Sequence, residues 1–262
     1  DSDFRKLPKH IGGFHMNSPW WFNTAIVKAT ADVACAYKLN IACYEAYGPA
    51  CLEGLQFSIG SIHEHAPHAP VILDVERGDI GNTSEKYVQA AFDEFRADAV
   101  TVNPYLGQDA LQPFLDRKDK GIFVLCRTSN KGAGEFQDRE VFIEGIHVPL
   151  YQYVALRVAC HWNANGNCAL VAGATHPAEL AEIRRLVPDM PLLIPGIGKQ
   201  GGDVEATVKA GMDSRGEGML INASSSIIFA SSGEDFAEAA GREAKRLHDL
   251  INACRKKGGA MC

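Results

Sequence analysis

The feature that most constrains the fold is a repeated alternation of short apolar runs with longer segments of helical periodicity. The apolar runs are rich in β-branched residues, and most are followed by a helical stretch. This order predicts a parallel sheet wrapped by helices, and so the α/β class. The predicted strands are Val33–Leu39, Val71–Glu76, Ala99–Asn103, Ile122–Arg127, Cys168–Ala172, Pro191–Pro195 and Met219–Asn222. The predicted helices lie around Trp20–Ala31, Cys51–His63, Ser84–Phe95, Ala110–Leu115, Leu150–Trp162, Pro177–Leu186, Gly202–Ala210 and Glu234–Ala253.

Seven predicted strands are one short of a closed (β/α)8 TIM barrel. The length of 262 residues is close to the typical barrel size of about 250, and no linker divides the chain. We therefore expect one barrel domain over residues 1–262. An open parallel sheet would leave unpaired edges, which closed barrels abolish. We expect the first strand to be missing just before Asp1, in a clipped chain, or in a permuted chain whose residues 258–262 lead toward that strand.

Composition excludes several classes of partner. A net charge of −6 argues against broad attachment to nucleic acid or to an acidic membrane surface. The apolar runs fall far short of the roughly 20 residues that a membrane helix needs, so we expect a cytoplasmic protein. The eight cysteines form no C-x-x-C pair, and most are expected to be buried thiols. A histidine cluster, His63-Glu64-His65 with His68, could hold a metal, but it stands at a predicted helix end, where the helix dipole favours histidine anyway.

Charged residues close two neighbouring predicted strands. Asp74 and Glu76 lie two positions apart, and the alternation of a strand would send both to one face. Lys38 and Asn40 end the preceding strand. Because reactive residues of a TIM barrel project from the carboxyl ends of its strands, these side chains are candidates for an active site. A lysine that simply reaches solvent is the equally weighted alternative.

A glycine-rich segment follows the penultimate predicted strand. It reads Pro195-Gly196-Ile197-Gly198-Lys199-Gln200-Gly201-Gly202-Asp203 and leads into a helix. Glycines let backbone N–H groups approach a phosphate at a helix N-terminus. Since TIM barrels commonly bind phosphate in the loops after their last two strands, this segment and Asn222–Ser226 predict a phosphate site.

Together, these segments resemble the orotidine 5'-monophosphate decarboxylase family, and the match covers nearly the whole chain. The family removes carbon dioxide from orotidine monophosphate to give uridine monophosphate in pyrimidine synthesis, without metal or cofactor. The segments that carry the resemblance are Asp1-Ser2-Asp3 with Leu7-Pro8, Lys38 with Asn40, Asp79-Ile80-Gly81-Asn82-Thr83, Thr101-Val102-Asn103-Pro104-Tyr105, Arg127-Thr128-Ser129-Asn130, Val171-Ala172-Gly173-Ala174-Thr175 and the glycine-rich loop.

The resemblance implies a role for each matching position. Lys38 and Asp74 would begin the family's charged Lys-Asp-Lys-Asp network, and Asp79 would end it, contributed with Ile80 and Thr83 across a homodimer interface. The implied contacts to the pyrimidine nucleotide are Asp1 with the ribose, Ser129 with the pyrimidine, and Gln200, Gly201 and Gly202 with the phosphate, with Asn40 beside the network and Pro195 at the start of the phosphate loop.

Two positions depart from the family pattern. The third member of the network should be lysine but is Glu76, and the phosphate-binding arginine after the last strand is Ser225. The family's lysine stabilises and then protonates the carbanion at pyrimidine C6, so a glutamate reverses the charge at that step. Serine removes a bidentate clamp on phosphate that a nearby Lys199 would not restore.

These departures leave three functional hypotheses. The first is a decarboxylase with strongly impaired activity. The second is a repurposed or engineered barrel in which Glu76 acts as a general base in a partly apolar cavity with a raised pKa. The third is a non-catalytic nucleotide binder. A metal site built from Asp74, Glu76 and Asp79 is a less favoured alternative.

Overall fold

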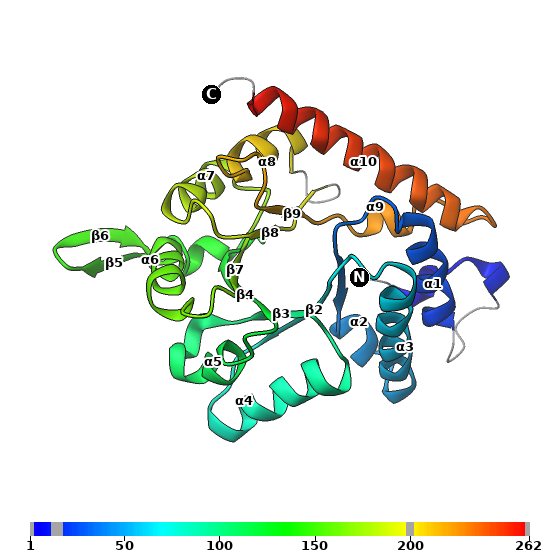
Figure 1. The fold of residues 1–262 in the computed structure, drawn as a ribbon, viewed down its shortest axis with the longest axis horizontal. Helices are drawn as coiled ribbons and strands as arrows, with labels where there is room; N and C mark the ends of the chain where they lie inside the picture. The colour runs from blue at the N-terminus through cyan, green and yellow to red at the C-terminus, as the bar shows by residue number, and fades with distance from the viewer. Residues whose placement is uncertain (1–2, 12–17, 198–201, 260–262) are drawn as a thin grey trace. The chain divides into compact units, whose positions relative to one another are not determined.

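The computed structural model describes residues 3–11, 18–197 and 202–259, and it confirms the predicted α/β class (Figure 1). Strands of the main sheet follow the order β1-β2-β3-β4-β7-β8-β9, which is also their order along the chain. The pairs β1–β2, β4–β7, β7–β8 and β8–β9 are parallel. Their bounds are β1 Tyr37–Asn40, β2 Val71–Arg77, β3 Ala99–Val102, β4 Gly121–Arg127, β7 Cys168–Ala172, β8 Leu192–Ile194 and β9 Met219–Ile221.

Most helices lie where the sequence predicts them. Their bounds are α1 Ser18–Thr30, α2 Ala42–Glu45, α3 Pro49–His65, α4 Gly81–Val88, α5 Gln108–Leu115, α6 Leu150–Arg157, α7 Pro177–Leu186, α8 Val204–Gly211, α9 Ser225–Ile228 and α10 Phe236–Gly259, with 3-10 turns η1 Phe4–Lys6, η2 Lys9–Ile11, η4 Pro104–Leu106 and η5 Ala133–Glu135. Two predicted α-helices end in π-helical segments, η3 Gln89–Glu94 after α4 and η6 Val158–Trp162 after α6.

One strand prediction was wrong at its beginning. The run Val33–Leu39 was expected to be extended throughout, but β1 starts only at Tyr37. Val33 and Ala34 instead donate their backbone N–H groups to Thr30 O at the end of α1. Apolar composition alone does not separate a strand from the turn that closes a helix.

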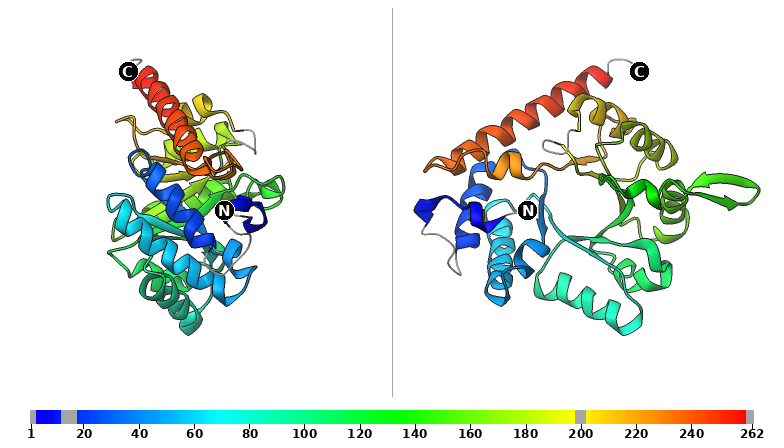
Figure 2. Two further views of the ribbon diagram at one scale, coloured as in Figure 1. Left: turned by 90° about the vertical axis from the view of Figure 1, so that its right-hand side faces the viewer. Right: turned by 180° about the vertical axis from the view of Figure 1, so that it is seen from behind.

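The chain divides into two compact units. Unit 1 comprises residues 1–75, 86–100 and 223–250, and unit 2 comprises residues 76–85, 101–222 and 251–262. In unit 1, α1 packs along α3, and Figure 2 shows the pair from two further directions. Phe22 is fully buried in this unit and stacks on Phe229 at 5.8 Å and on Phe236 at 5.2 Å between ring centroids. These aromatic contacts hold the start of α10 against α1.

In unit 2 the sheet from β4 to β9 carries the core. Every residue of β7 and β8 is buried, as expected for parallel strands that are covered on both faces. Helices α7 and α8 pack against each other beside them. The carboxyl ends of β4 and β8 lead into the loops that hold Ser129 and Pro195.

A β-hairpin in unit 2 was not predicted. Strands β5 Glu140–Ile143 and β6 Ile146–Pro149 pair antiparallel, and Figure 1 shows the hairpin standing out beside α6. Its two-residue turn has positive φ at Glu144 (49°) and Gly145 (91°), as hairpin turns of this length require. The turn signal in the sequence is weak because only its second residue is glycine.

No helix among the described residues is long and apolar enough to cross a membrane.

A buried arginine ties the loops of unit 2 together. The Arg184 guanidinium donates to five backbone carbonyls, those of Val187, Pro188, Met190, Gly211 and Gly218. Arg184 is only 7% exposed, and burial lowers the pKa of its guanidinium. Its rigid fork of donors suits several fixed acceptors at once.

We expect Arg184→Lys to lower the free energy of unfolding by about 3 kcal/mol, because one ammonium group leaves buried carbonyls without donors. Urea unfolding measures this change. Arg185→Lys is the matched control. Arg185 pairs with Glu182 on the surface, so the control should shift stability by less than about 0.5 kcal/mol. Equal effects of the two variants would contradict the structural role of Arg184.

Candidate active site

The centre of the candidate site in unit 1 is a buried ion pair between adjacent strands. Lys38 Nζ donates to Asp74 Oδ2 at 2.5 Å, and the two side chains are 8% and 10% exposed. The parallel register pairs Lys38 with Ile72 and Asn40 with Asp74. Lys38 and Asn40 therefore share a face with Asp74, and the alternative that Lys38 simply reaches solvent is wrong.

Asn40 is a second donor to the same oxygen of Asp74. Its amide nitrogen donates to Asp74 Oδ2 at 3.2 Å, while its amide oxygen accepts from the Ala42 backbone N–H at 3.0 Å. The second bond orients the amide, since it places the oxygen toward the start of α2. Asn40 was predicted to lie beside the charge network, and the structure shows it positioning Asp74.

Glu76 departs from the predicted geometry. Its φ is +46°, a conformation that side-chain-bearing residues rarely adopt, and its backbone N–H donates to Thr101 Oγ1 at 3.0 Å. The left-handed backbone interrupts the alternation of β2. Asp74 is buried whereas Glu76 is exposed, so the expected partly apolar cavity around Glu76 is not found.

After β2 ends at Arg77, a short loop in unit 2 carries Asp79 and Ile80 and leads into α4, which carries Thr83. Asp79 Oδ1 accepts the Ile80 backbone N–H at 2.8 Å, and Ile80 is 64% exposed. The loop lies close to the end of β3, because a Cβ on Gly78 would sit 2.8 Å from Asn103 O. Thr83 is exposed on the first turns of α4.

Ser129 is held tightly within unit 2. Thr175 Oγ1 donates to Ser129 O at 3.2 Å, and a Cβ on Gly173 would lie 2.8 Å from Ser129 Cα. Glycine is thus required where the end of β7 passes the loop after β4. Gln137 clamps the same loop, since its Oε1 accepts the Thr128 N–H at 2.8 Å and its Nε2 donates to Thr128 Oγ1 at 2.9 Å.

Sequence patterns did not indicate these supporting residues as functional positions. Gly173 and Thr175 belong to a segment that carried the family resemblance, but their contact with Ser129 depends on two loops that are distant in sequence. Gln137 offers no sequence signal, since a lone glutamine in a polar loop is usually solvated.

The glycine-rich loop of unit 2 contains a second close approach. Gly202 donates its N–H to Gly196 O at 3.1 Å, and a Cβ on Gly202 would lie 2.8 Å from both Gly196 O and Ala174 Cβ. Pro195 O accepts the Ala174 N–H, and the Asp203 carboxylate caps α8 by accepting the Ala206 N–H at 2.6 Å. Gln200 and Gly201, with Lys199, lie outside the described residues, as does Asp1.

Ser225 is the first residue of the short helix α9 in unit 1 and is half-buried. The neighbouring Ser224 hydroxyl is buried and has no hydrogen-bond partner in the described part of the chain. The loop that follows β9 therefore presents hydroxyl groups and no cation at the position where the family resemblance implies an arginine.

Residues that could hold a metal or act as a nucleophile are not gathered. Within the described ranges, no group of three or more His, Cys, Asp or Glu side chains is arranged around a metal position. His63 instead contacts Asp98 at 3.1 Å, and His65 lies 3.9 Å from Glu64. The seven described cysteines are free thiols: four are buried, Cys43 is partly buried, and Cys35 and Cys160 are exposed. Burial raises the pKa of Cys126 to about 12 and of Cys168 to about 11, so both remain protonated.

A family model described as orotidine 5'-phosphate decarboxylase / HUMPS matches residues 21–240. The chain belongs to this family. An orotidine 5'-phosphate decarboxylase from Janthinobacterium sp. (strain Marseille) is 50% identical to it over 252 residues, which cover 96% of this chain and 90% of the relative.

Solved structures agree with the family assignment. The OMP decarboxylase of Leishmania donovani is 36% identical, with a TM-score of 0.81, and the match covers 94% of this chain and 90% of that one. The UMP synthase of the same organism is 40% identical, also with a TM-score of 0.81, and the match covers 90% of this chain and 50% of that longer protein. These decarboxylase neighbours confirm the predicted (β/α) barrel fold.

We expect Asp74→Ala to lower the free energy of unfolding by about 3–5 kcal/mol, because the buried Lys38 would lose the carboxylate that it contacts at 2.5 Å. Urea denaturation tests this. The double variant Lys38→Met/Asp74→Leu should recover most of the loss, since an apolar pair removes the buried charge altogether. If Asp74→Ala unfolds at the same urea concentration as the unaltered chain, Lys38 is neutralised or solvated by other groups.

Proposed function

We propose that this chain is a pyrimidine-nucleotide-binding orotidine 5'-monophosphate decarboxylase whose decarboxylation is strongly impaired. The observation that carries the proposal is the buried Lys38–Asp74 pair, held by Asn40, at the positions where the family resemblance implies the first half of the charge network. A buried ion pair is costly to maintain for stability alone, which supports a chemical role for it.

The impairment follows from the charge at position 76. The family's lysine would supply a positive field to the carbanion that forms as carbon dioxide leaves, and Glu76 places a carboxylate there. Removing one preorganised group typically lowers the rate by about 10²–10³, and reversal of charge should lower it further. Decarboxylation therefore depends on a side chain that this sequence lacks.

The backbone at position 76 supports this interpretation. A left-handed residue that is anchored through Thr101 Oγ1 is a local strain of the kind found at functional positions. The same strained geometry can display a lysine as readily as a glutamate, because both are unbranched at Cβ. The exposure of Glu76 gives no support to a general base with a raised pKa.

Phosphate binding should also be weaker than in the family. Ser225 offers one hydroxyl where an arginine would make a bidentate, charge-assisted contact, each bond of which is worth about 1.5–3 kcal/mol. In the described part of the glycine-rich loop, Gly202 packs against Gly196 and Ala174, and the Asp203 carboxylate caps the first turn of α8. We therefore propose residual nucleotide binding that is dominated by the pyrimidine and ribose, in a cytoplasmic enzyme of pyrimidine synthesis.

The proposal includes a homodimer in which Asp79, Ile80 and Thr83 reach a second copy. Its support is an exposed apolar surface in unit 2: Ile80 is 64% exposed, Tyr105 82% and Leu106 48%. The loops that carry them are packed together, since Asn103 N donates to Arg77 O at 2.8 Å. Exposed apolar groups on rigid neighbouring loops are typical of a protein interface.

We expect purified protein to decarboxylate orotidine monophosphate at a small fraction of the rate of its Glu76→Lys variant. The gain should be at least about 10²-fold in kcat, because a cation is restored at the carbanion. Adding Ser225→Arg should lower KM further. Absorbance of the pyrimidine ring follows the reaction, and Lys209→Arg serves as a matched control that keeps a surface cation.

Family-like turnover by the unaltered chain would refute the charge argument at Glu76. If the double variant is also inert but isothermal titration detects uridine monophosphate, the chain is a nucleotide binder that has lost catalysis at further positions. If neither activity nor binding of uridine monophosphate is found at millimolar concentration, the proposed function fails.

We expect Ile80→Asp/Tyr105→Asp to convert a dimer into a monomer, because two carboxylates would then be buried at each copy of the interface. Sedimentation velocity measures the change. Phe142→Asp is the control, since Phe142 is equally exposed (67%) but lies on the separate hairpin. A dimer that survives the double substitution would place the interface elsewhere.

A further inference from the structure

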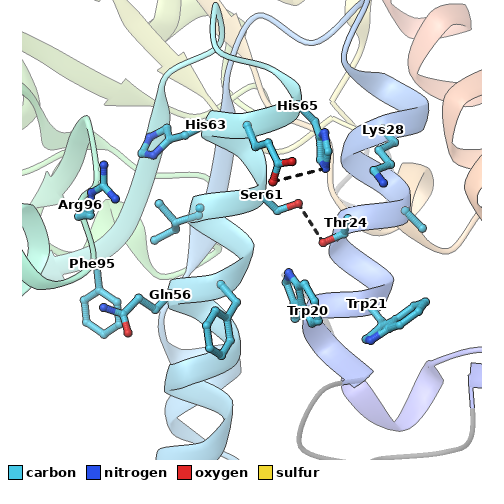
Figure 3. Close-up of a pocket in the computed structure, with 15 residues that line it drawn as sticks. Trp20, Trp21, Thr24, Lys28, Gln56, Ser61, His63, His65, Phe95 and Arg96 are labelled. Carbon is cyan, nitrogen blue, oxygen red and sulfur yellow. Dashed lines mark hydrogen bonds and ion pairs between the residues drawn. The ribbon is translucent and has the colours of Figure 1, made fainter.

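A surface groove in unit 1 has no part in the proposed reaction. It has a volume of about 730 Å3, within the range of about 300–1,000 Å3 that is common for small-molecule sites. The groove is lined by α1, α3 and the two residues that follow η3, and we call it the α1–α3 groove (Figure 3). Its main walls are Trp20, Trp21, Phe57, Phe95, Lys28 and Arg96.

Aromatic rings dominate the groove. Trp20 lies 6.1 Å from Trp21 in an edge-to-face arrangement and 5.9 Å from Phe57, measured between ring centroids. Trp21 is nevertheless 65% exposed and Phe57 56% exposed. Exposure of a cluster of aromatic rings to water is unfavourable in free energy. Such exposed apolar clusters are typical of binding sites.

Gly60 is one of the residues that line the groove. It is an exposed residue within α3, one turn from Phe57 and one turn from Glu64, and a Cβ built on it would meet nothing within 4 Å. Glycine weakens a helix relative to alanine, and packing in this fold does not require it here. Figure 3 shows Phe95 and Arg96 on one side of α3 and Trp20 and Trp21 on the other, and Gly60 places no side chain on the helix between them.

Arg96 is held in a conformation that favours glycine. Its φ is +58°, directly after η3. The Phe95 N–H donates to Ala90 O and the Ala97 N–H donates to Ala91 O, so the chain closes the helix end around a left-handed residue. Glycine usually occupies this position because it has no Cβ to strain. Arg96 therefore occupies a position whose backbone conformation favours glycine.

Three unfavourable choices thus coincide in one groove: exposed aromatic rings, a helix-interior glycine and a left-handed arginine. The glycine and the left-handed arginine do not improve the packing of unit 1, and Trp21 and Phe57 remain largely exposed. Natural sequences are locally consistent except where function requires otherwise. Their coincidence therefore indicates a binding site rather than scattered surface variation.

The charges in the groove favour an anion. Among the described residues, neither Lys28 nor Arg96 forms an ion pair, and these two cations face one lining carboxylate, Glu64, which is largely exposed and lies 3.9 Å from His65. Two unpaired cations next to a surface of aromatic rings stand out on a chain with a net charge of −6. Arginine and aromatic rings together bind flat, negatively charged molecules, by stacking and by charge-assisted hydrogen bonds.

We propose that the α1–α3 groove binds a planar aromatic anion, with the ring on the aromatic surface and the charge at Arg96. The site goes beyond the proposed decarboxylase function and does not depend on it, since every lining residue belongs to unit 1 and none is a candidate active-site residue. A peptide segment of another protein is the competing occupant, and titration with a small aromatic anion separates the two.

Intrinsic fluorescence reports this site directly, because two of the three tryptophans of the chain line the groove and Trp162 is buried. The probe is adenosine monophosphate, titrated in the presence of saturating uridine monophosphate so that a pyrimidine-nucleotide site is already filled. Adenosine and inorganic phosphate are titrated for comparison, because each carries only one of the two parts of the probe. We expect saturable quenching by adenosine monophosphate and at least about tenfold weaker binding of adenosine or of inorganic phosphate.

Two variants separate binding from folding. Arg96→Gly should raise Tm by a few degrees, because it relieves the left-handed strain, and should weaken binding by about tenfold or more. Gly60→Leu should also stabilise α3 and should weaken binding, because it places a bulky side chain among the lining residues. Glu144→Gly is the matched control, because it relieves a left-handed backbone in the hairpin turn of unit 2 and should leave binding unchanged.

The proposal is overturned if adenosine monophosphate gives no saturable signal at millimolar concentration, as a groove built for a peptide would behave. It is also overturned if Arg96→Gly or Gly60→Leu binds as tightly as the unaltered chain, or if adenosine alone binds as well as its monophosphate. Loss of the proposed decarboxylase activity would not affect any of these outcomes.

Discussion

The contact between Lys38 and Asp74 is the constraint on which the candidate site depends. Two charged side chains that are 8% and 10% exposed must stay paired, because a single one left in this environment would be strongly unfavourable. The parallel register of β1 and β2 brings them together, and Asn40 completes the set of donors. The register of the two strands, which their hydrophobic residues help to fix, therefore determines the position of this ion pair at the strand ends.

Much of the fold could be predicted because its elements have simple periodicity. Strand β7 was predicted at its observed bounds, since a short buried run between polar turns has few other interpretations. The hairpin of β5 and β6 could not be predicted in the same way. Its strands alternate weakly, and its turn depends on a left-handed Glu144. The π-helical ends of α4 and α6 also escape sequence patterns, because a small change in helical pitch leaves the apolar spacing nearly unchanged.

The candidate site also contains some residues that could be predicted from the sequence and others that could not. Lys38 and Asp74 were predictable because both close apolar strands, and parallel strands present their ends together. The environment of Glu76 was not, since strand alternation indicates neither its left-handed backbone nor its exposure. Gly173 beside Ser129 and the rings of the α1–α3 groove bring together residues far apart in sequence, so their juxtaposition becomes visible only in the folded chain.

The backbone at position 76 also bears on how such a protein could change over time. Thr101 Oγ1 holds the backbone N–H of residue 76, and this hydrogen bond does not depend on which side chain residue 76 carries. Lysine and glutamate codons differ by a single base. An active decarboxylase and a silent one could therefore be separated by a single point mutation on a shared scaffold, and loss or recovery of the chemistry need not pass through an unstable intermediate.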